Sequence, residues 1–78
     1  MNKYKTELFD VTFNESTGQE GESVTITHCK NGDFLDLFDL VAVCNEVEDL
    51  LHIGAISSFE AIKIIHKATA FFIRGRTP

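Results

Sequence analysis

Three histidines and two cysteines are the residues of this chain best suited to bind a metal or act as nucleophiles. They are His28, Cys29, Cys44, His52 and His66. None of their spacings matches the CxxC, HxxxH or HExxH patterns of zinc sites. Adjacent residues of a strand point to opposite faces, so His28 and Cys29 are poorly placed to bind the same metal ion. We therefore expect neither a bound metal nor a cofactor.

Catalytic chemistry finds little support elsewhere in the sequence. Cys44 falls on the apolar side of an expected helix, where a thiol is an inert packing group. The carboxylates between residues 36 and 49 are numerous, but they are expected on a solvated helix surface. Gly18 and Gly21 lie among acidic residues, which is the wrong charge for a phosphate cradle. The sequence predicts a non-enzymatic protein.

The charge of the chain constrains its partners. The formal net charge is −5, and all 12 acidic residues lie between Glu7 and Glu60. Nucleic-acid affinity comes mainly from neutralising phosphates, so this balance argues against direct nucleic-acid binding. It permits a partner with a basic surface, and we expect that partner to be a protein or nucleoprotein complex.

Four cations stand apart from these acids. Lys63, Lys67, Arg74 and Arg76 follow Glu60 with no acid among them. On a helix they form either a solvated stripe or a contact for nucleic acid or an acidic partner. No aromatic residue is interleaved with them on that stripe, so stacking on bases is not supported.

Apolar runs in the chain are short. The run at residues 40–44 is far below the roughly 20 residues that span a bilayer. The first residues are charged, but no apolar stretch follows them, so the sequence does not predict a secretory signal. We expect a cytoplasmic protein with two reduced thiols and no membrane contact.

Strand patterns occupy the first third of the chain. Apolar and polar residues alternate over residues 4–13, which predicts one strand with Phe9, Val11 and Phe13 on its core face. A polar loop with two glycines follows. Alternation over residues 22–29 predicts a second strand, antiparallel to the first, with His28 on its apolar face.

Residues 34–51 allow two interpretations. The Asn-Gly pair at 31–32 often closes a hairpin, so Phe34 could begin a third strand. A helix is favoured because Asp33 is a good N-cap and because Asp33, Asp36 and Asp39 recur every three residues. Gly54 should end this helix. Its expected core side consists of Leu37, Leu40, Val41, Cys44, Val47 and Leu51.

A second helix should begin at residue 57. Ser57 and Glu60 have the spacing of a capping box, in which each side chain satisfies a free backbone N–H. The expected inner face comprises Ala61, Ile65, Ala68 and Phe72, flanked by Ile62, Ile64 and Phe71.

These elements predict a single α+β domain over residues 1–78. An antiparallel β-hairpin is followed by two α-helices packed on it, in the order ββαα. A lone hairpin is marginal in water, so both helices must cover its apolar face. Its open edges remain available to a strand of another copy or of another protein.

The first helix provides the candidate contact surface. Its polar side carries apolar residues among carboxylates, a combination typical of protein interfaces. The predicted partner-binding residues are Leu35, Asp36, Phe38, Asp39, Glu46 and Asp49. Self-association into a homodimer would bury the same surface.

In size, acidity, single-domain build and lack of a catalytic signature, the chain resembles the small inhibitors made by phages and mobile elements, including anti-CRISPR proteins. The resemblance implies an inhibitor that binds a larger protein or nucleoprotein complex, with carboxylates standing where phosphates would sit. Two other functions remain open. One is a homo-oligomeric accessory subunit, and the other is a dimeric nucleic-acid-binding regulator that uses the basic C-terminal helix.

Overall fold

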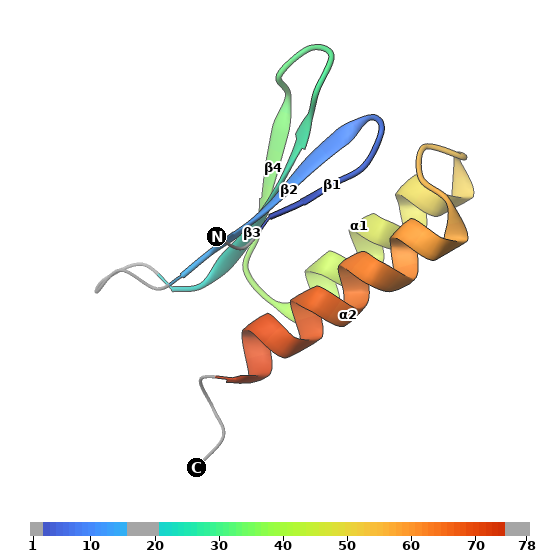
Figure 1. Cartoon of the computed structure of the whole chain (residues 1–78). Coiled ribbons are helices and arrows are strands. Elements are labelled where there is room, and N and C mark those ends of the chain that lie inside the picture. The colour runs from blue at the N-terminus through green and yellow to red at the C-terminus, as the bar shows by residue number, and fades with distance from the viewer. Residues whose placement is uncertain (1–2, 16–20, 75–78) are drawn as a thin grey trace.

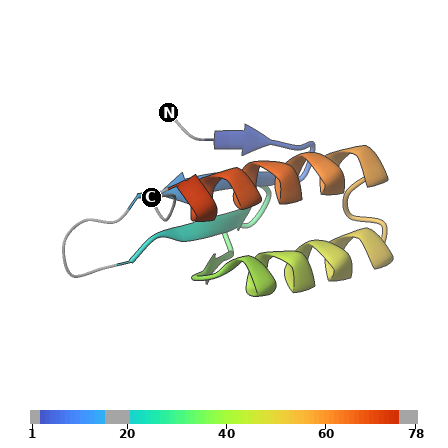
Figure 2. The same cartoon turned by 90° about the horizontal axis from the view of Figure 1, so that it is seen from below.

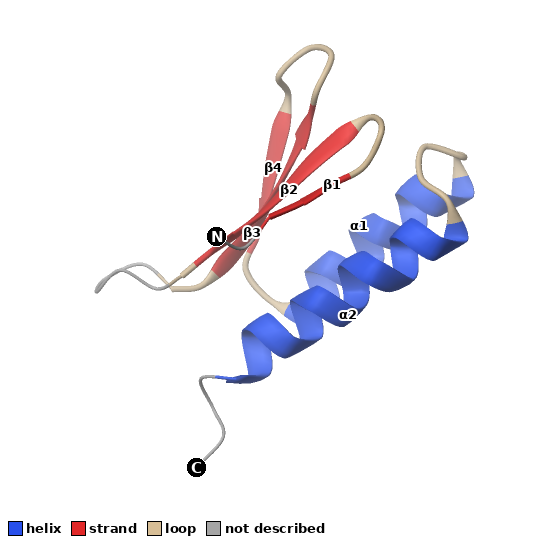
Figure 3. Ribbon diagram, viewed as in Figure 1, coloured by secondary structure: helices blue, strands red, loops and turns tan. Residues whose placement is uncertain are grey.

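A four-stranded antiparallel sheet precedes two helices in the computed structural model, which describes residues 3–15 and 21–74. The elements are β1 (Lys3–Lys5), β2 (Phe9–Asn14), β3 (Ser23–His28), β4 (Phe34–Leu37), α1 (Leu40–His52) and α2 (Ser58–Arg74). The strands lie in sequence order across the sheet, and both helices lie side by side on one face (Figures 1 and 3). The α+β prediction is confirmed, but the sheet has four strands rather than two.

The first difference arises at Thr6, where the single strand predicted over residues 4–13 is divided into β1 and β2. The Thr6 hydroxyl accepts a hydrogen bond from the Phe9 N–H at 3.0 Å, and the Thr6 N–H donates to the Phe9 carbonyl at 2.9 Å. Such local side-chain bonds compete with a continuous strand and reverse the chain. As a result, Tyr4 pairs with Val11 and packs against the core rather than facing solvent.

The second difference is that the expected helix start at Phe34 was wrong. Residues 34–37 form β4, with Leu35 opposite Ile26 in the register with β3. Asp33 does not cap a helix, because it belongs to the preceding turn, where its N–H donates to Asn31 Oδ1 at 3.0 Å. The strand alternative for Phe34 was right, because pairing with β3 brings Leu35 and Leu37 of β4 to the core face of the sheet.

Asp39 caps α1 in place of Asp33. Its Oδ1 atom accepts from the Ala42 N–H at 2.8 Å. The predicted stop at Gly54 is confirmed, since this glycine has a φ of +79° and its N–H donates to the Leu51 carbonyl. The later start changes the buried side of the helix, and Val41, expected in the core, is 69% exposed. The buried residues of α1 are Val43, Val47 and Leu50.

The capping box that begins α2 is confirmed. The Glu60 N–H donates to Ser57 Oγ at 3.1 Å, and the Ser57 N–H donates to Glu60 Oε1 at 2.9 Å. Ile62, expected to flank the core, is exposed instead. The buried residues of α2 are Ala61, Ile64, Ala68, Phe71 and Phe72.

The core lies between the helices and one face of the sheet. The Phe13 ring of β2 meets the Phe71 ring of α2 with centroids 5.5 Å apart. The other face of the sheet is polar and carries a hydrogen-bond chain across three strands. Asn14 donates to Thr25 Oγ1 at 2.8 Å, and Thr25 donates to Asp36 Oδ1 at 2.6 Å. The sheet therefore has one packed face and one solvated face.

Ile64→Ala should lower the free energy of unfolding by about 2–5 kcal/mol, because it leaves a cavity at a fully packed position. Ile62→Ala, the same change on the exposed side of the same helix, should cost at most about 0.5 kcal/mol. Urea unfolding followed by circular dichroism measures both. Equal losses would contradict the burial of Ile64 described here.

Asp39→Ala should lower the free energy of unfolding by about 1 kcal/mol, because the first turn of α1 loses its side-chain acceptor. Asp33→Ala should cost less, since the Asp33 carboxylate caps no helix. The same unfolding measurement decides between the two positions. A larger loss of unfolding free energy for Asp33→Ala would indicate that Asp33 caps a helix that begins at residue 34.

Candidate functional site

The side chains with metal-binding or nucleophilic chemistry lie apart in the fold. Within residues 3–15 and 21–74, no three His, Cys, Asp or Glu side chains are grouped closely enough to hold a metal ion. Cys29 is an exposed free thiol and Cys44 a half-buried one. His28 has a structural role. Its ring meets Phe9 edge-on at 5.0 Å, and its Nδ1 accepts from the Lys30 N–H at 3.2 Å.

A groove lies between the β3–β4 hairpin and the C-terminal half of α1. Figure 1 shows this hairpin rising away from the helix layer, so the hairpin end of the sheet is not covered by α1. The groove has a volume of about 310 Å³. Its apolar lining comes from Phe9, Ile26, Phe34, Leu35, Leu50 and Ile53, and its polar lining from His28, Asn31, Asp33 and Glu46.

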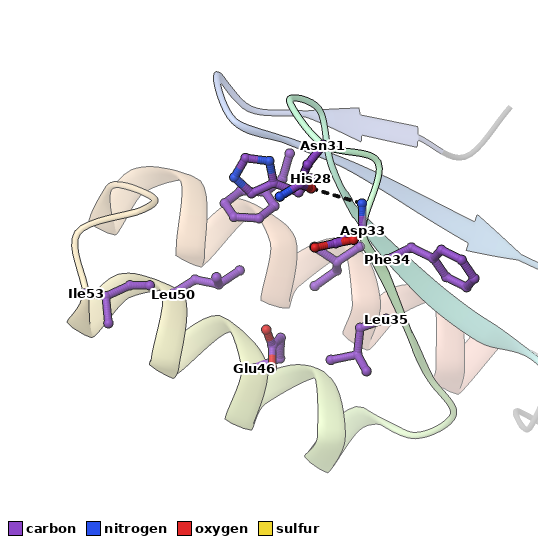
Figure 4. Close-up of a pocket in the computed structure, with 10 residues that line it drawn as sticks. His28, Asn31, Asp33, Phe34, Leu35, Glu46, Leu50 and Ile53 are labelled. Carbon is purple, nitrogen blue, oxygen red and sulfur yellow. Dashed lines mark hydrogen bonds between the residues drawn. The ribbon is translucent and has the colours of Figure 1, made fainter.

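The close-up in Figure 4 shows how the groove is built. Leu50 and Glu46 rise from α1 toward the sheet, and Leu35 points toward them from β4. The ring of Phe34 points away from α1, as expected for its alternate position on the strand. The groove therefore combines an apolar interior with the carboxylates of Asp33 and Glu46.

The free edge of β4 runs along this groove. The His28 N–H donates to the Asp33 carbonyl at 2.7 Å, so residues 28 and 33 form a hydrogen-bonded pair. Such pairs alternate along an antiparallel ladder, which directs the backbone groups of Leu35 and Leu37 toward β3. The N–H and C=O groups of Phe34 and Asp36 then point to the open edge. No described segment pairs with β4 on that side.

The opposite edge of the sheet is protected. β1 presents Lys3 and Lys5, and Lys5 Nζ lies 3.3 Å from Asp10 Oδ1. Lysines on an edge strand discourage the addition of another strand. β4 has no lysine, and its Phe34 and Leu35 side chains are 66% and 45% exposed. The two edges therefore differ in their readiness to accept a partner.

The six predicted partner-binding residues do not share a helix as expected. Leu35 and Asp36 belong to β4, Phe38 and Asp39 to its connection with α1, and Glu46 and Asp49 to α1.

Their side chains have different roles. Leu35 and Glu46 line the groove. Phe38 directly follows β4 in the chain and is 64% exposed. Asp36 points to the solvated face of the sheet, where it accepts from Thr25. Asp39 is occupied as the α1 cap. Leu35, Phe38 and Glu46 are therefore the best placed of the six for contact.

Sequence reasoning missed the groove itself. Ile26, His28, Asn31, Asp33 and Ile53 come together only because β4 pairs with β3 and lies beside α1. The available signal was the Asn-Gly turn at 31–32, which predicts the hairpin when it is given more weight than the spacing of the acids.

The cations of α2 make local contacts with aromatic rings. Lys63 Nζ lies 5.7 Å from the Phe59 ring centroid, and Lys67 Nζ lies 5.9 Å from that of Tyr4. Arg74 ends α2, but its side chain lies outside the described part, as does all of Arg76. The two described lysine side chains of α2, Lys63 and Lys67, are thus one turn apart on that helix.

No protein-family model, curated protein or solved structure matches the chain. Among the described residues, neither helix has the length and apolar character needed to cross a membrane.

The amide protons of Leu35 and Leu37 should exchange with solvent at least about tenfold more slowly than those of Phe34 and Asp36. The reason is that only the first two face β3 in the ladder. Hydrogen-exchange NMR on the full chain measures all four amides. Equal protection of Phe34 and Asp36 would show that the β4 edge is already paired or covered.

Proposed function

We propose that this chain is a non-enzymatic inhibitor that docks onto the basic site of a larger protein or nucleoprotein complex. The contact is the β4–α1 surface, which comprises the open edge of β4, the groove beside it and Phe38. The supporting observation is the combination of an unprotected strand edge with an apolar groove rimmed by carboxylates. A strand edge and a side-chain groove are the two parts of strand-addition recognition.

The docking mode follows from the β4 edge. An extended segment of the partner pairs with the outward backbone groups of Phe34 and Asp36. Alternate side chains of that segment then point toward α1 and enter the groove beside Leu35 and Leu50. Backbone pairing supplies affinity, and the groove selects the side chains.

The charge of the surface indicates which segment fits. Asp33 and Glu46 line the groove, and none of its described lining residues is Lys or Arg. A segment that alternates apolar residues with Lys or Arg complements this lining. Basic segments of this kind line nucleic-acid-binding sites, so occupation by an acidic protein excludes the nucleic acid. Pairing two β4 edges of this chain would bring like charges together, which favours a different protein as the partner.

Variants of Glu46 and Glu7 test the role of charge. A tagged chain captures its partner from the native cells, and the purified partner is then titrated calorimetrically. Glu46→Lys should weaken binding about tenfold or more, because it places a cation against a basic segment. Glu7→Lys makes the same change of net charge at the exposed β1–β2 turn and should alter the dissociation constant less than about threefold. Equal losses would reject the β4–α1 surface as the contact.

Variants of Phe34 test the docking mode. Phe34→Pro removes an outward N–H without removing a ladder bond to β3, and proline is tolerated at such edge positions. It should weaken binding about tenfold, whereas Phe34→Ala keeps the N–H and should have the smaller effect. The reverse order would mean that the Phe34 ring, and not the strand edge, makes the contact.

A further inference from the structure

A second surface lies on the side of the helix layer that faces away from the sheet. Its exposed apolar residues are Val41 and Leu51 of α1 and Phe59, Ile62 and Ile73 of α2. Val41 and Ile62 are the most exposed of these, at 69% and 67%. Exposed apolar residues that gather on one face mark an interaction surface.

Helix geometry places these residues on one outer face. At about 100° per residue, Ile62, Ile73 and Phe59 lie roughly 130–170° around α2 from the centre of its buried side. Val41 lies roughly 150° around α1 from its own buried side, and Leu51 lies nearer the seam with α2. Figure 2 shows the two helices side by side when the molecule is seen from below. The surface is therefore distinct from the groove, which lies between α1 and β4.

The two helices carry opposite charges on this face. α1 has Glu48 and Asp49 on its exposed side and no Lys or Arg along its length. α2 has Lys63 on this face, whereas Lys67 lies at the side of the helix, with its Nζ against the Tyr4 ring of β1. The single acid of α2, Glu60, is used in the capping box. An acidic helix beside a basic helix makes this face complementary to a second copy of itself.

We propose that the chain forms a two-fold homodimer through this outer helical face. The two-fold axis runs parallel to the helices, so α1 of each copy lies against α2 of the other. This arrangement brings the Glu48 side of one copy to the Lys63 side of the second. The other face-to-face arrangement, with α1 on α1, would place acid against acid.

The size of the face sets the expected strength of the dimer. The 13 residues of α1 and the 17 residues of α2 make helices about 20 and 25 Å long. Two packed helices present a width of about 20 Å, which places the contact at the small end of specific interfaces. We therefore expect a dimer that dissociates on dilution.

The dimer leaves both β4 edges free. They lie on the other side of α1 from the outer helical face, so each dimer carries two copies of the β4–α1 surface. A partner with two basic sites would then be bound with greater avidity. The dimer itself does not depend on the proposed function.

Sedimentation equilibrium of the full chain from about 1 μM to 1 mM tests the dimer, and the average mass should rise to twice that of the monomer. Ile62→Glu should weaken the dimer about tenfold or more. Phe34→Glu is the control, since it also places a carboxylate at an exposed apolar position but on β4, away from the outer helical face, and it should leave the dimer unchanged. Circular dichroism checks that both variants fold. A monomer throughout the range, or equal effects of the two variants, would overturn the dimer.

Charge exchange tests the arrangement of the helices. Glu48→Lys and Lys63→Glu should each weaken the dimer severalfold, and the double variant should restore it. If α1 packed on α1, Glu48 and Lys63 would not face each other across the interface, and the double variant would not restore the dimer. Failure of the double variant to restore it therefore overturns the proposed axis. The two proposals can fail separately. Ile62→Glu should lose the dimer and keep partner binding at the β4 edge, so the dimer and the proposed function are tested independently.

Discussion

The pairing of β4 with β3 is the interaction on which the rest of the structure depends. It places Leu35 and Leu37 on the core face of the sheet and fixes where α1 begins. The chain then turns at Asp39, whose carboxylate caps α1 and sets which side of that helix is buried. The same pairing leaves the outer edge of β4 free and forms the groove against Leu50. A helix over residues 34–37 would have removed both the edge and the groove.

Local signals in the sequence were sufficient for part of this fold. The capping box at Ser57 and the stop at Gly54 depend on neighbouring residues only, and both were predicted correctly. The start of α1 was not, because Asp33 and Asp39 are equally good caps and only the long-range pairing of β4 distinguishes them. The hydroxyl of Thr6 divides the first strand in a similar way, although alternation alone suggested continuity. The groove joins residues from β2, β3, β4 and α1, so no local pattern could have identified it.

The separation of charge within the chain has different consequences at the two surfaces. Among the described residues that line the groove beside the β4 edge, the charged groups are the carboxylates of Asp33 and Glu46, so a basic partner would meet opposite charge there. On the outer helical face an acidic helix lies beside a basic one, so a second copy turned by a two-fold axis meets opposite charge. One distribution of charge thus favours a foreign strand at one surface and self-association at the other.

Apolar exposure gives a physical reason for expecting both surfaces to be covered. A chain of 78 residues buries only about 60% of the surface of its unfolded state, so its core cannot take in every apolar side chain. The exposed large apolar residues are nevertheless not scattered. Within residues 3–15 and 21–74, all but Leu8 belong to the β4–α1 side (Phe34, Leu35, Phe38 and Ile53) or to the outer helical face (Val41, Leu51, Phe59, Ile62 and Ile73). Left in water, an open apolar strand edge and an apolar helix face each promote aggregation. The β1 edge carries lysines that discourage such contacts, yet the β4 edge and the outer helical face keep their exposed apolar residues. This difference is expected if each of the two surfaces is an interface.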